Sequence, residues 1–92
     1  MMDITKKKTV VGNTITIDSE EIKRDNIKHV LRLVKEALDE RGYNSVNQLV
    51  GYLISNDPAY ISSHKDARKM IQTLDRNDII EELVRSYLSG EQ

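Results

Sequence analysis

The sequence predicts an all-α protein: a compact bundle of four helices plus one short helical turn, preceded by a flexible N-terminal tail. Three observations indicate this fold. Apolar residues recur at three- and four-residue spacing through residues 18–92. Residues suited to starting and ending helices divide that region into short segments. Residues 1–17 are instead rich in Thr, Val and Ile and poor in helix formers, so we assign them to a tail and residues 18–92 to one helical domain.

The first predicted helix runs from Asp18 to Arg41. Asp18 is a favourable N-cap, and Glu21 stands three residues later, as in a capping box. Gly42 is expected to end the helix, because glycine adopts the left-handed conformation at no steric cost. The apolar residues of this helix are Ile22, Ile27, Val30, Leu31, Val34, Ala37 and Leu38.

The second helix is predicted to begin at Ser45, with Gln48 three residues later as in another capping box. Gly51 lies in the middle of this helix, where glycine lowers helix stability by about 1 kcal/mol relative to alanine. We therefore expect another helix to approach closely there. The apolar residues of the second helix are Val46, Leu49, Val50, Leu53 and Ile54.

The remaining helical segments follow further start signals. Asp57 suits an N-cap and Pro58 the first helical position, which predicts a short turn. Ser63 with Asp66 predicts the start of the third full helix, and residues 75–78 begin the fourth. The apolar residues of these two helices are Ala67, Met70, Ile71 and Leu74 in the third, and Ile79, Ile80, Leu83, Val84, Tyr87 and Leu88 in the fourth.

The composition excludes several classes of protein. Because the chain has no cysteine, it has no disulfide, no thiolate nucleophile and no cysteine-based zinc site. It lacks an apolar run of the roughly 18 residues that cross a bilayer, and its start lacks the apolar segment of a signal peptide, so we expect a cytoplasmic protein. A formal net charge of −1 argues against a protein that chiefly binds nucleic-acid phosphates.

The sequence contains no recognisable catalytic or metal-binding motif, and we predict neither an enzyme nor a cofactor. His29 lies within the first predicted helix, where a surface position is expected. His64 and Asp66 could form a base and its orienting group, but residues two apart on a helix do not face each other. No nucleophile is placed beside them, and two histidines without cysteine offer little to a transition metal.

Basic residues gather around the third helix. The spacing of Lys65, Arg68 and Lys69 predicts that they share a helix face, and Arg76 follows nearby. A solvated face is the default interpretation, and a contact for an acidic partner or a phosphate is the functional one. The two helices around Gly42 also allow a helix-turn-helix DNA-binding regulator as an alternative, although the second helix contains no Arg or Lys.

Several segments, taken in order, resemble one known family. The chain resembles the IreB/ReoM regulatory phosphoproteins over roughly residues 20–89. The segments that carry the resemblance are Gly42–Ser55, Asp57–Ile61, His64–Arg68 and Ile79–Val84.

This resemblance implies a small helical homodimer that is the substrate of a membrane Ser/Thr kinase with extracellular PASTA domains and of a matching phosphatase. It implies control of peptidoglycan synthesis and of tolerance to cell-wall antibiotics. In one branch of the family, the unmodified protein promotes degradation of the UDP-N-acetylglucosamine enolpyruvyl transferase by a Clp protease, and phosphorylation relieves this.

The resemblance also implies which residues act. The family is phosphorylated on a tail threonine followed by an apolar residue, for which Thr9 is the first candidate and Thr14 the second. The added phosphate could interact with Lys6–Lys8 or with Arg68. The expected partner-binding residues are Lys65, Arg68 and Arg76, while the family's arginines at two further positions are replaced here by Ser63 and Gln72.

Overall fold

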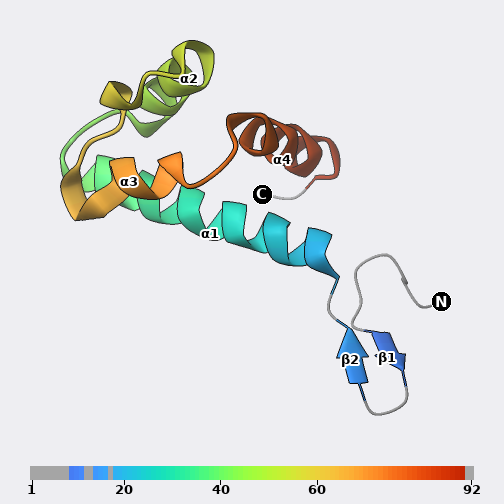
Figure 1. Ribbon diagram of the computed structural model, residues 1–92. Coiled ribbons are helices and arrows are strands. Elements are labelled where there is room, and N and C mark those ends of the chain that lie inside the picture. The colour runs from blue at the N-terminus through green and yellow to red at the C-terminus, as the bar shows by residue number, and fades with distance from the viewer. Residues whose placement is uncertain (1–8, 12–13, 17, 91–92) are drawn as a thin grey trace.

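A computed structural model describes residues 9–11, 14–16 and 18–90 of the 92-residue chain. Its helices confirm the predicted all-α fold with four helices (Figure 1). The helices are α1 (Ser19–Glu40), α2 (Ser45–Ser55), α3 (Ala67–Gln72) and α4 (Arg76–Leu88). Two 3₁₀ turns, where one had been expected, separate α2 from α3: η1 (Pro58–Tyr60) and η2 (His64–Asp66).

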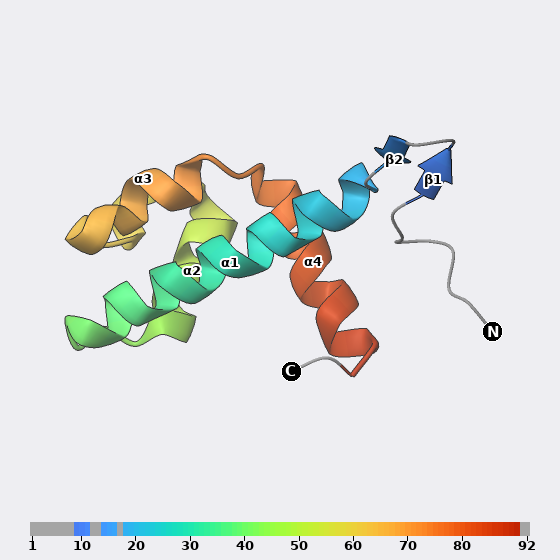
Figure 2. The same ribbon diagram turned by 90° about the horizontal axis from the view of Figure 1, so that it is seen from below.

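The long helix α1 supports the other three helices. Helices α2 and α3 cluster over its C-terminal half, and α4 crosses its N-terminal half (Figures 1 and 2). The core lies between these helices and is aliphatic apart from one tyrosine. Its buried residues are Val30, Val34, Ala37, Leu38, Tyr52, Ile61, Ala67, Ile71 and Ile79.

Local signals place most helix ends. The side chain of Asp18 caps α1 by accepting a hydrogen bond of 2.9 Å from the amide of Glu20, as its N-cap assignment predicts. Gly42 follows α1 with a φ of +77°, the predicted left-handed stop. For α2 the predicted N-cap is wrong by one residue. The side chain of Asn44, not that of Ser45, accepts the capping hydrogen bond, which the amide of Asn47 donates.

The predicted start of the third helix at Ser63 is wrong, because the backbone turns sharply there. Lys65 and Asp66 have φ values of +53° and +61°, in the left-handed region. They form the end of η2, and α3 begins only at Ala67. Ser63 makes no capping bond through its side chain, whereas the Ser62 hydroxyl accepts one from the amide of His64. Consecutive left-handed residues other than glycine are rarely signalled by local sequence.

Part of the tail forms a small hairpin. Strand β1 (Thr9–Val11) pairs with β2 (Thr14–Thr16) in antiparallel fashion, with Thr9 opposite Thr16. The sequence prediction assigned both segments to the tail and did not predict that they pair. The hairpin lies beyond the N-terminal end of α1 (Figures 1 and 2). The prediction of a flexible tail falls largely on residues 1–8, 12–13 and 17, which lie outside the described residues.

Candidate functional site

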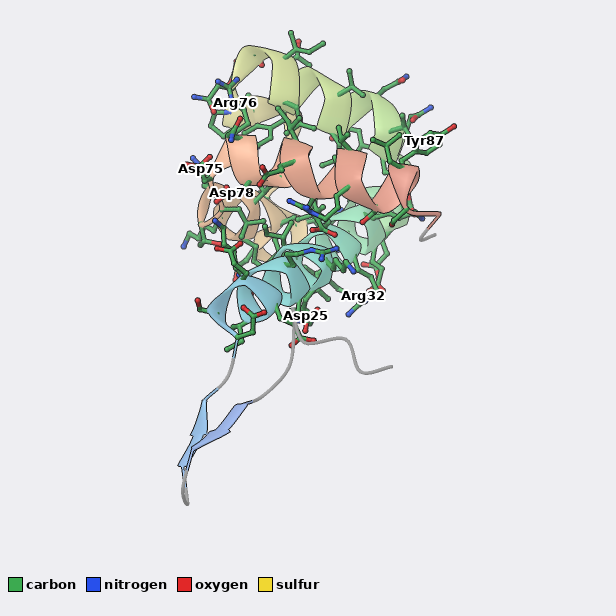
Figure 3. All side chains as sticks on the ribbon, turned by 90° about the vertical axis from the view of Figure 1, so that its right-hand side faces the viewer. Asp25, Arg32, Asp75, Arg76, Asp78 and Tyr87 are labelled. Atoms are coloured by element: carbon green, nitrogen blue, oxygen red, sulfur yellow. The ribbon has the colours of Figure 1, made fainter. Side chains whose placement is uncertain are left out.

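The largest departure from the sequence prediction is an apolar surface along α4. The prediction assigned its six large apolar residues to one set, but in the structure Ile79 alone is fully buried. Tyr87 is 77% exposed and Leu88 is 76% exposed at the C-terminal end of the helix. Figure 3 shows Tyr87 at that end of α4. The outward-facing residues are Ile80, Leu83, Val84, Tyr87 and Leu88, and we call the last four, toward the C-terminal end of the helix, the α4 apolar surface.

Helix α2 also leaves apolar residues exposed. Tyr52 is its buried anchor, while Val46, Val50 and Ile54 follow one another at four-residue spacing on the exposed side. Exposed apolar clusters on a small soluble domain mark interaction sites more often than scattered single residues do. Both helices contain more apolar residues than one buried face can hold. This excess is the signal in the sequence that could have indicated exposure.

The three predicted partner-binding residues do not form one row. Because Lys65 precedes α3 in a left-handed conformation, the prediction that it shares a helix face with Arg68 and Lys69 is wrong. The Lys65 ammonium lies 3.0 Å from a carboxylate oxygen of Glu40, the last residue of α1. Lys65 thus lies beside the C-terminal end of α1 and remains largely exposed.

Both arginines of the predicted surface bind backbone carbonyls. The Nε atom of Arg68 donates to the carbonyl of Ile61 over 2.8 Å. A terminal guanidinium nitrogen of Arg76 donates to the carbonyl of Leu53, in the last turn of α2, over 3.1 Å. Each arginine therefore joins two chain segments, and its remaining N–H donors are what a partner could use.

His64 has a partner that the sequence did not reveal. Its Nε2 atom lies 2.7 Å from Glu40, and not against Asp66 as the proposed dyad required. Hydrogen bonds from His64 and then Lys65 hold the pKa of the Glu40 carboxyl below its usual value. The pair is structural: it fixes η2 to the end of α1.

A buried carboxylate joins α1 to α4. Glu82 is 3% exposed, and its oxygens accept hydrogen bonds from Arg24 at 2.7 Å and from the Ser86 hydroxyl at 2.8 Å. Lys28 lies 3.8 Å away. Burial alone would raise the pKa of Glu82, but the hydrogen bonds from Arg24 and Ser86 and the charges of Arg24 and Lys28 outweigh it, so the pKa lies below its usual value.

Residues 12–89 match the family described as IreB regulatory phosphoprotein. The chain belongs to the IreB family. The match spans all four helices and confirms the resemblance drawn from the sequence. A regulatory role is therefore a property of this chain's family.

The two phosphorylation candidates of this IreB-family protein both lie in the hairpin. Thr9 begins β1, and Thr14 begins β2 opposite Val11. The family match starts at residue 12, so Thr14 lies inside it and Thr9 lies before it. The suggested contact between a tail phosphate and Arg68 stays a prediction. Arg68 belongs to α3, which lies over the C-terminal half of α1, whereas the hairpin lies beyond the N-terminal end of α1 (Figure 1).

Two further observations bear on this IreB-family chain. No helix in the described part of the chain has both the length and the apolar character to cross a membrane. Within residues 18–90, no three His, Asp or Glu side chains gather as they would around a metal ion.

Proposed function

We propose that this IreB-family protein is a non-enzymatic phospho-switch of the cytoplasm. In this proposal a PASTA-type Ser/Thr kinase and its phosphatase set the phosphorylation of the tail. The protein then controls peptidoglycan synthesis and tolerance to cell-wall antibiotics. The observation that carries the proposal is the match of residues 12–89 to a family of regulatory phosphoproteins.

The proposed mechanism is binding. In its most specific form, the unmodified protein presents the UDP-N-acetylglucosamine enolpyruvyl transferase to a Clp protease, and phosphorylation ends this. Two features support a binding role: exposed apolar residues on α2 and α4, and side chains at Lys65, Arg68 and Arg76 whose donors are only partly used.

The first proposed partner is a second copy of the chain, bound through the α4 apolar surface. Val84 and Leu88 line a hollow on this surface, with Glu81 and Arg85 beside it. If two α4 helices pair in antiparallel fashion about an axis between Val84 and Tyr87, Val84 of each copy lies opposite Tyr87 of the other. The apolar surface is then self-complementary, as a twofold interface requires.

The alternative, a DNA-binding regulator, finds no support in α2, its candidate recognition helix. This helix exposes Val46, Val50 and Ile54 and has no cationic side chain to contact phosphates or base edges. We therefore do not propose it.

Incubation with the cognate kinase domain and ATP, followed by intact mass measurement and peptide mapping, tests the switch. We expect one phosphate on the tail, at Thr9 as the first assignment and Thr14 as the second. Thr9→Ala and Thr14→Ala serve as matched variants, since each removes one hydroxyl from the same hairpin. Loss of labelling in one of the two assigns the site.

Undiminished labelling of the double variant, or labelling confined to the helical domain, would contradict the assignment. A chain that takes up no phosphate at all would contradict the switch itself.

A further inference from the structure

A polar hollow lies where the last turn of α2 meets the first turn of α4. Its volume is about 540 Å³, within the range of sites that bind small ligands or peptide side chains. Figure 3 shows Arg76 and Asp75 at this end of the molecule, beside the end of α2. The residues that matter below are Leu53, Ile54, Asn56, Arg76, Asn77 and Ile80, and we call their hollow the Arg76 pocket.

Arg76 is held in place by the fold and is not neutralised by it. One guanidinium nitrogen donates to the carbonyl of Leu53, which fixes the plane of the group at the end of α2. In the part of the chain that the structure describes, no carboxylate lies within salt-bridge distance of Arg76. A guanidinium has five N–H donors, so donors remain for a ligand.

The one acidic wall residue is already engaged. Asp75 caps α4, and its Oδ1 atom accepts from the amides of Asn77 at 2.8 Å and of Asp78 at 3.3 Å. The Asp75 carboxylate therefore faces its own helix, yet its charge stays in the wall of the pocket.

The rim of the pocket is apolar and its sides carry amides. Ile54 is 78% exposed and Ile80 is 40% exposed. Asn56 and Asn77 each present a side-chain amide, which can donate to and accept from a peptide backbone. A guanidinium flanked by aliphatic side chains and amides can contact both the side chains and the backbone of an extended peptide segment. A flat protein surface would fit into such a hollow less well.

We propose that the Arg76 pocket binds an extended segment of a partner protein in which a carboxylate residue stands next to an aliphatic residue. The carboxylate pairs with the guanidinium of Arg76, and the aliphatic side chain packs between Ile54 and Ile80. This inference rests on the proposed function, in which the protein acts by binding, and it names the chemistry of the bound segment.

The pocket selects a carboxylate over a phosphate on electrostatic grounds. Arg76 is the single cation in its lining, and the negative charge of Asp75 shares the wall. A carboxylate carries one charge and matches the guanidinium fork. A phosphate group carries up to two charges, and the one guanidinium of the pocket, which already has Asp75 beside it, leaves the second charge uncompensated.

A titration followed by NMR tests the proposal. The full ¹⁵N-labelled chain is titrated to about 5 mM with blocked hexapeptides whose central pair is Leu-Asp, Leu-Asn or Leu-phosphoserine. We expect saturable shifts of the side-chain signals of Arg76, Asn56 and Asn77 with the Leu-Asp probe. Binding of the Leu-Asn probe should be about tenfold weaker, because the charged hydrogen bonds are lost.

Two variants separate binding from folding. Arg76→Lys keeps the charge but loses the fork, and we expect about tenfold weaker binding of the Leu-Asp probe. Ile54→Ser removes an exposed rim residue and should weaken binding about fivefold with an unchanged spectrum elsewhere. Val46→Ser, a change at another exposed apolar residue two turns away on α2, is the matched control and should leave binding unaffected.

Three results would overturn the proposal: no saturable shift at these residues, equal binding of the Leu-Asn probe, or tighter binding of the phosphoserine probe. The last would identify a phosphate site. Because these titrations use the unmodified chain without kinase, they can fail while kinase labelling of the tail succeeds, and the reverse also holds.

Discussion

Gly51 shows how one missing side chain positions a neighbouring segment. A Cβ atom at this position would lie 2.5 Å from two ring carbons of Tyr60, well inside van der Waals contact. Tyr60 belongs to η1, and its carbonyl accepts a hydrogen bond of 2.8 Å from the side chain of Gln48. The sequence predicted a close approach at Gly51, but by another helix. The approaching group is instead an aromatic ring from a 3₁₀ turn.

We expect Gly51→Ala to lower the free energy of unfolding by about 1 kcal/mol, since the ring of Tyr60 must move away from its contact. In a Tyr60→Ala background the clash is absent. There the same change should raise the free energy of unfolding by about 1 kcal/mol, the ordinary gain of alanine over glycine in a helix. Urea denaturation of the four proteins measures both values.

The Tyr60→Ala background is the control, because Gly51→Ala causes the same change in helix propensity there without a contact to the tyrosine ring. Equal effects of Gly51→Ala in both backgrounds would mean that Tyr60 does not constrain this position.

At the scale of elements, helix α4 is attached to α1 through charged as well as apolar contacts. Glu82 is buried between Arg24, Lys28 and Ser86, and Lys23 of α1 lies 3.3 Å from the carboxylate of Asp78. Removing one partner of a buried pair leaves an uncompensated charge, which costs more than the pair itself contributes.

Glu82→Gln should lower the free energy of unfolding by about 2 kcal/mol at pH 7, because a neutral amide cannot replace the charged hydrogen bonds that the buried carboxylate accepts. The pKa of Glu82 is lowered in the folded state, so its contribution is present above the usual carboxyl pKa and is lost as pH falls through the lowered value. The deficit of the variant should therefore shrink below about pH 4. Urea denaturation at fixed chain concentration and several pH values measures this.

Glu81→Gln is the matched control, since Glu81 precedes Glu82 on α4 but its side chain is 61% exposed. Its effect should stay within about 0.5 kcal/mol at every pH. A pH-independent deficit for Glu82→Gln would show that the carboxylate is not charged in the folded protein.

The helices themselves could be predicted from sequence because their ends depend on neighbouring residues. Asp18, Asp57 and Asp75 cap helical segments with their own side chains, so a window of a few residues contains the signal. The left-handed Lys65 and the bond between His64 and Glu40 could not be predicted, since they depend on segments more than twenty residues apart.

The candidate site was predictable only in part. Lys65, Arg68 and Arg76 were identified, but the carbonyls that two of them bind were not. Periodicity also overestimated the core: Ile22 of α1 is 51% exposed although it follows the apolar spacing. Apolar periodicity shows that a residue can be buried, whereas the number of elements packed around it decides whether it is.

For the molecule as a whole, the α4 apolar surface predicts self-association. We expect sedimentation equilibrium to give twice the chain mass of 10.6 kDa. Leu83→Glu should give the mass of a single chain, because it places a charge within the α4 apolar surface. Circular dichroism should show unchanged helix content, since Leu83 is already 44% exposed.

Val46→Glu is the control on the exposed side of α2, and we expect it to leave the dimer intact. A single-chain mass for Val46→Glu but not for Leu83→Glu would move the interface to α2. A single-chain mass for the unaltered protein at all concentrations would contradict the dimer.

The length of α1 has a consequence for how a phosphate on the tail can act. With 22 residues the helix is about 33 Å long, and the hairpin and Lys65 lie at its two ends. In physiological salt the field of a charge decays over about 8 Å, so four such lengths separate them. The charge of a phosphate on Thr9 or Thr14 is therefore screened before it reaches Lys65, at the C-terminal end of α1 in the same chain. The phosphate can therefore act only on a molecule that contacts the tail directly, or on a second copy whose C-terminal end of α1 lies beside the tail.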